Sequence, residues 1–68
     1  MSQTLSAVIF WDDGWFVAEC PETGMVSQGK TVAEALANLK EATELYLEDF
    51  PIKTTRHLLL TTFEANIA

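Results

Sequence analysis

The segment TLSAVIFWDDGWFVAEC, residues 4–20, carries the strongest structural signal in this chain. Its two halves, residues 4–11 and 15–20, are rich in β-branched and aromatic side chains, which is typical of β-strands. The tripeptide Asp12-Asp13-Gly14 lies between them, and glycine can adopt the left-handed conformation that closes a three-residue hairpin loop. The segment therefore predicts an antiparallel β-hairpin with a three-residue loop.

The loop length fixes which side chains share a face of the hairpin, because neighbouring residues of a strand point to opposite faces. A three-residue loop places Trp11 opposite Trp15 and Ile9 opposite Val17. On this face we expect an apolar interface that also carries one acid, formed by Ile9, Trp11, Trp15, Val17 and Glu19. The other face carries Phe10 and further apolar side chains, so both faces of the sheet need to be covered.

The rest of the chain predicts a third strand, a helix and a fourth strand. A short strand over residues 25–28 follows a turn that contains proline and glycine. Thr31 and Glu34 have the spacing of a helix capping box. Apolar residues then recur at three-to-four spacing until the next proline, which predicts a helix over residues 32–49. A strand over residues 58–65 completes the pattern.

The expected architecture is a single α+β domain, residues 1–68, with the order β-β-β-α-β. Four strands form a mostly antiparallel sheet, the fourth returns parallel to the first, and the helix covers one face. A chain of 68 residues buries only a thin core. Because one helix cannot cover both apolar faces, we expect a homodimer, a higher oligomer or a protein partner.

The charge balance argues against several classes of partner. Lys and Arg number 4 against 10 Asp and Glu, which gives a formal net charge of −6. This is the wrong sign for binding nucleic-acid phosphates or an anionic membrane. No apolar run approaches the roughly 20 residues of a membrane span, and no secretory leader is visible. With a lone cysteine, these features favour a cytoplasmic protein that contacts neither nucleic acid nor membrane directly.

No group of residues has the spacing of a catalytic or cofactor site. Asp12 and Asp13 are explained by turn formation, and Glu19 by a cross-strand or interface contact. Cys20 suits a small buried side chain before proline, and His57 has no nucleophile or acid at a diagnostic spacing. One Cys and one His also fall short of the four ligands of a structural zinc site. We therefore expect a protein that is not an enzyme and holds no metal or cofactor.

Acidic side chains gather near the C-terminal end of the expected helix, at Glu44, Glu48 and Asp49. The helix dipole favours cations at this end, so three acids here are unfavourable for the helix itself. They are candidate contacts for a basic partner. The alternative is that these acids only keep the exposed surface of the helix hydrated.

Several motifs, taken in order, resemble the HicB antitoxin family. They are GWFVAECP at residues 14–21, SQGKT at residues 27–31, and EALANLKEA at residues 34–42, followed by Tyr46-Leu47. The resemblance covers about residues 8–49 and implies a partial RNase H-like β-β-β-α-β fold. It also implies a dimer that neutralises a small basic HicA-type toxin, which cleaves messenger RNA. Larger members add a C-terminal DNA-binding domain, so this chain resembles a short form without it.

Two further classes of function stay open. One is a solitary HicB-like structural or regulatory interaction protein that has no toxin. The other is an RNase H-like hydrolase, active or degenerate. A small basic open reading frame beside this gene would favour the antitoxin, whereas divalent-metal binding with nuclease activity would favour the hydrolase.

Overall fold

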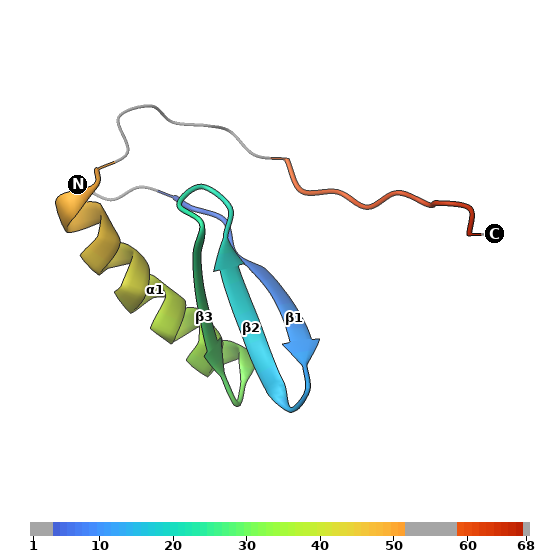
Figure 1. Cartoon of the computed structure of the whole chain (residues 1–68), viewed down its shortest axis with the longest axis horizontal. Helices are drawn as coiled ribbons and strands as arrows, with labels where there is room; N and C mark the ends of the chain where they lie inside the picture. Colours follow the sequence, from blue (N-terminus) through green and yellow to red (C-terminus); the bar gives the residue numbers. More distant parts are fainter. Residues whose placement is uncertain (1–3, 52–58, 68) are drawn as a thin grey trace.

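The computed structural model describes residues 4–51 and 59–67 and shows a sheet packed against one long helix (Figure 1). The elements are β1 (Val8–Asp12), β2 (Trp15–Cys20), β3 (Met25–Gly29) and α1 (Val32–Asp49). The α+β class is confirmed, and α1 has the bounds that the sequence predicts. The first strand begins at residue 8 rather than at residue 4.

The loop between β1 and β2 has two residues, so the predicted three-residue loop is wrong. Asp12 pairs with Trp15, which leaves only Asp13 and Gly14 unpaired. Both have positive φ angles, 46° and 89°, as a type I′ turn requires. This turn suits the right-handed twist of the two strands, and Asp-Gly is one of its preferred sequences.

The shorter loop shifts the pairing of β1 with β2 by one residue. Side chains of β1 that were predicted to share a face with Trp15 and Val17 therefore lie on the opposite face. Trp11 lies opposite Phe16, and Ile9 lies opposite Ala18. The Trp11 and Phe16 rings meet edge to face, with centroids 4.9 Å apart. The predicted opposition of Trp11 and Trp15 is therefore wrong, and these two side chains lie on different faces of the sheet.

The strands form one antiparallel sheet in the order β1-β2-β3. The turn between β2 and β3 begins at Pro21. The backbone N–H of Gly24 donates to the carbonyl of Cys20 at 2.8 Å. The Thr23 hydroxyl accepts from the Met25 N–H at 3.2 Å, which fixes the start of β3.

Helix α1 begins and ends where local chemistry satisfies its backbone. The Thr31 hydroxyl accepts from the Glu34 N–H at 3.0 Å, which confirms the Thr31 half of the predicted capping box. At the other end, the N–H of Phe50 donates to the carbonyl of Tyr46 at 2.9 Å, directly before Pro51. The Tyr46 and Phe50 rings also stack, at a centroid distance of 5.1 Å.

The core lies between α1 and strands β2 and β3. Its buried apolar members are Ala18, Cys20, Ala35 and Leu39. Gly29 is buried where the first turn of α1 crosses β3, and a Cβ atom there would lie 2.6 Å from the backbone nitrogen of Ala35. The partly buried residues around this core are Leu5, Ala7, Ile9, Phe16 and Met25. The small side chains at the centre allow the helix to lie close to the sheet.

The predicted fourth strand is not part of this sheet. Residues 59–67 are described and belong to no strand, and Figure 1 shows them running away from the sheet. Leu59 and Phe63 are 87% and 88% exposed. The first residue of the prediction, Leu58, and His57 lie outside the described residues.

Candidate protein interface

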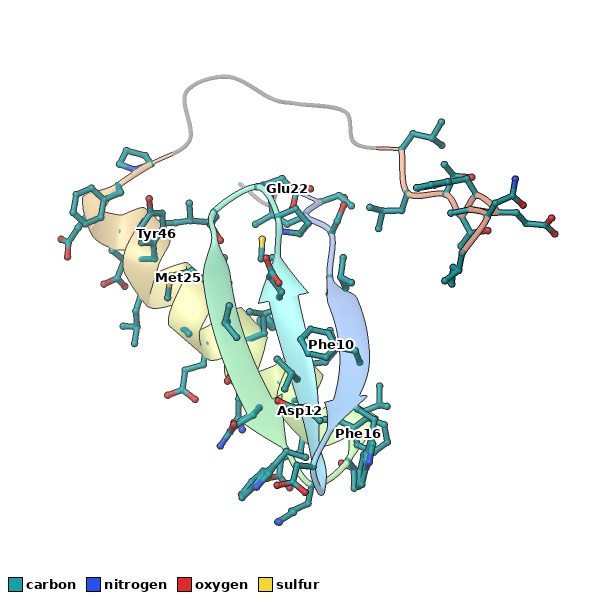
Figure 2. All side chains as sticks on the ribbon, turned by 45° about the vertical axis from the view of Figure 1, so that its right-hand side comes forward. Phe10, Asp12, Phe16, Glu22, Met25 and Tyr46 are labelled. Atoms are coloured by element: carbon teal, nitrogen blue, oxygen red, sulfur yellow. The ribbon has the colours of Figure 1, made fainter. Side chains whose placement is uncertain are left out.

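The sheet face that points away from α1 is the candidate site, and we call it the open face. The register places one alternating set of side chains from all three strands on it. They are Val8, Phe10, Asp12, Trp15, Val17, Glu19, Val26 and Gln28. Figure 2 shows Phe10 over the middle of the sheet. The helix, which packs against the opposite face, cannot reach these residues.

The centre of the open face is apolar and accessible. Phe10 is 45% exposed and Val26 56%, while Val8 and Trp15 are 38% and 36% exposed. Val17 lies between them and is half-buried. Large apolar side chains that gather on one accessible face are typical of a protein–protein interaction site.

Polar groups surround this apolar centre. The Lys30 Nζ lies 3.6 Å from the centroid of the Trp15 ring, a cation–π contact at the end of β3. Asp12 and Glu19 are exposed on the same face. An apolar centre with a polar rim is the usual composition of a protein interface.

The structure brings together three of the five predicted interface residues. Trp15, Val17 and Glu19 share the open face, whereas Ile9 and Trp11 lie on the face covered by α1. Ile9 packs against the core there. Trp11 stays 59% exposed, because the helix lies over β2 and β3 rather than over β1.

Sequence reasoning missed Val8, Phe10 and Val26 as members of the open face. The signal that identifies the first two is the Asp13-Gly14 pair, since it favours a two-residue type I′ turn. With that turn, the alternation along β1 places Val8 and Phe10 beside Val17. Val26 follows from its pairing with Glu19.

The acidic residues Glu44, Glu48 and Asp49 are exposed on α1. The last turn of the helix contains no basic residue, so nothing within that turn offsets the unfavourable dipole interaction. Because α1 forms the other layer of the molecule, these acids do not adjoin the open face (Figure 1). The two predicted interaction surfaces are therefore separate.

Three residues with titratable or nucleophilic side chains, Asp13, Cys20 and Glu22, lie in a turn, in the core and in a hydrogen-bonded contact, respectively. Asp13 lies in the hairpin turn, and Cys20 is buried in the core. Both carboxylate oxygens of Glu22 accept from the Ser6 N–H, at 3.0 and 3.1 Å, and the Cys20 thiol lies 3.4 Å from Oε1. Figure 2 shows Glu22 at the end of the sheet opposite to the turn that follows Asp12.

The hydrogen bonds of Glu22 tie the segment before β1 to the turn after β2. Burial works to raise the pKa of this carboxyl group, but hydrogen bonds with its own backbone, Ser6 and Cys20 outweigh that effect and lower the pKa below its ordinary value. Within residues 4–51 and 59–67, no three His, Cys, Asp or Glu side chains gather as a metal site would require. No helix in the same ranges is long and apolar enough to cross a membrane.

The comparisons with known proteins match this chain to UPF0150 proteins and to a family of unknown function. The chain is 47% identical over 51 residues to the UPF0150 protein ssl0738 of Synechocystis sp., a match that covers 72% of this chain and 71% of that protein. It is 52% identical over 46 residues to a UPF0150 protein of Helicobacter pylori, covering 66% of this chain and 64% of the relative. The chain therefore spans somewhat less than two thirds of that second protein.

No solved structure matches this chain at a significant level. The profile of a family of unknown function, DUF7387, matches residues 3–59, which is most of the chain and includes all three strands and the helix. The chain therefore belongs to the DUF7387 family of unknown function.

Proposed function

We propose that this protein is a non-enzymatic binding module of the HicB antitoxin type, which neutralises a small basic HicA-type toxin that cleaves messenger RNA. The observation that carries this proposal is the open face, where apolar side chains from all three strands are accessible together. A binding protein needs such an accessible apolar surface.

The charge of the chain supports a basic partner. The formal net charge is −6, and long-range attraction between an acidic protein and a basic one speeds their association. The open face carries Asp12 and Glu19 at its rim, and α1 carries Glu44 and Glu48. A toxin bound to the open face would contact Asp12 and Glu19 directly. It would interact with Glu44 and Glu48 only through long-range electrostatic attraction.

The HicB resemblance supplies the rest of the proposal. It implies a homodimer and a partial RNase H-like fold, to which residues 58–65 would add the fourth strand. The lone cysteine favours the cytoplasm. Self-association also suits a chain whose sheet has one face covered by a helix and one face open. A solitary interaction protein without a toxin would use the same open face.

The test is coexpression of the full chain with the product of a small basic reading frame beside its gene, followed by copurification and an RNA-cleavage assay. Phe10→Ser should weaken inhibition about tenfold or more, because it removes an apolar side chain at the centre of the open face. Leu45→Ser is the matched control, since Leu45 is 59% exposed on α1. Circular dichroism should show that both variants remain folded.

Each outcome bears on a different part of the proposal. Failure of the unaltered protein to bind or inhibit the toxin would overturn the antitoxin function. Normal inhibition by Phe10→Ser, with loss in Leu45→Ser, would move the interface to α1. Metal-dependent nuclease activity of the purified chain would support a hydrolase instead.

A further inference from the structure

The two edges of the sheet differ in how well their backbone groups are satisfied. In the order β1-β2-β3, one edge belongs to β1 and the other to β3, and an edge strand presents unpaired N–H and C=O groups. The β3 edge lies beside α1, and the Asn38 side chain donates to the carbonyl of Gln28 at 2.9 Å. A helix side chain therefore satisfies one of the carbonyl groups at the β3 edge.

The β1 edge has no such cover among the described strands and helix. In a two-residue hairpin the residues that flank the turn, Asp12 and Trp15, form a hydrogen-bonded pair. Pairs alternate along an antiparallel ladder, so Phe10 also bonds toward β2, while Ile9 and Trp11 direct their N–H and C=O groups outward. These two residues offer a row of donors and acceptors to a further strand.

Residues 59–63 have the composition of a strand that has no partner. They read Leu-Leu-Thr-Thr-Phe, and the three apolar side chains are 87%, 57% and 88% exposed. Five extended residues span about 16 Å, which equals the length of the five-residue strand β1. Figure 1 shows this segment, drawn in orange, leaving the sheet of its own chain.

We infer that residues 59–63 of one copy add as an outer strand to the β1 edge of a second copy, and that the second copy does the same in return. Leu59, Thr61 and Phe63 fall on one side of such a strand and, placed beside Trp11, they would bury a ring that is 59% exposed. A reciprocal exchange closes both β1 edges at once, as two-fold symmetry demands. This inference rests on the proposed self-association but not on the toxin.

The first test is the mass of the full chain in solution, measured by light scattering during size-exclusion chromatography. The unaltered chain should be a dimer. Proline at both Thr61 and Thr62 should halve the mass, because consecutive residues direct their N–H groups to opposite sides of a strand, so one of the two changes must remove a donor to β1. Ala65→Pro is the matched control and should remain dimeric, since it lies beyond the pairing segment. An unchanged mass in the Thr61→Pro, Thr62→Pro double variant would overturn the inference.

The second test separates exchange between copies from return of the segment to its own sheet. In a mixed dimer of one isotope-labelled and one unlabelled copy, filtered NMR should show contacts between the amides of Ile9 and Trp11 and the methyl groups of Leu59 and Leu60 across copies. Contacts confined to a single copy would overturn the inference, as would their absence. Toxin inhibition is measured in a separate assay. A dimer that exchanges these strands but does not bind the toxin would contradict the proposed function and leave this inference intact.

Discussion

Gly29→Ala tests whether the helix approaches the sheet as closely as described. The Cβ atom of an alanine would lie 2.6 Å from the Ala35 nitrogen and 2.9 Å from the carbonyl carbon of Glu34. Both are backbone atoms of α1, so no side chain can rotate to relieve the contact. The first turn of the helix would have to move away from β3 by several tenths of an ångström.

The expected cost follows from two opposing effects. Overpacking a closely packed site costs about 1–3 kcal/mol, and the rigid backbone neighbours place this case in the upper half of that range. Replacing glycine by alanine returns about 0.4–1 kcal/mol, because the unfolded chain becomes less flexible. The free energy of unfolding should therefore fall by about 1–2.5 kcal/mol, which lowers the Tm of a domain of this size by about 4–20 °C.

The assay is urea and thermal unfolding followed by circular dichroism, with Gln28→Ala as the control. Gln28 is the exposed neighbour of Gly29 on β3, and its change should alter the free energy of unfolding by less than about 0.5 kcal/mol. A Gly29→Ala variant as stable as the unaltered chain, or more stable, would refute the close approach of α1 to β3.

Two further predictions concern single side chains. Thr31→Ala should lower the free energy of unfolding by about 1 kcal/mol in urea titrations, because the Glu34 N–H loses its cap, whereas Thr31→Ser should retain most of it. Because the pKa of Glu22 is lowered in the folded state, its contribution to stability should be complete above the ordinary value of 4.5 and disappear as the pH falls through the lowered value. Glu22→Gln should flatten that acid-side decline in thermal unfolding; an unchanged decline would assign it to other carboxylates.

The helix was predictable because several local signals agree on its position. Thr31 caps the N-terminus, apolar residues follow at helical spacing, and Pro51 stands just beyond the C-terminal end. The second strand was equally clear from its aromatic and β-branched residues. Such elements depend on neighbours in the sequence, so single-sequence reasoning locates them well.

Neither the register of β1 against β2 nor the pairing of the predicted fourth strand can be read from the types of residue in each segment. Asp12-Asp13-Gly14 is compatible with a two- or a three-residue loop, and the choice moves Phe10 from one face to the other. For this reason three of the five predicted interface residues, Trp15, Val17 and Glu19, share the open face. Residues 59–63 have strand-like composition, but a strand forms only where an edge accepts it, and that edge can belong to another molecule.

Binding of a toxin to the open face, as we propose, would protect the backbone amides beneath it from exchange with solvent. Amide hydrogen exchange, measured on the full chain alone and with the product of any small basic reading frame beside its gene, should show protection along β1 and β2 in the complex, because Phe10 and Trp15 would face the proposed partner. Protection confined to α1 around Glu44 and Glu48, with unchanged exchange in the strands, would contradict the claim that the open face binds protein.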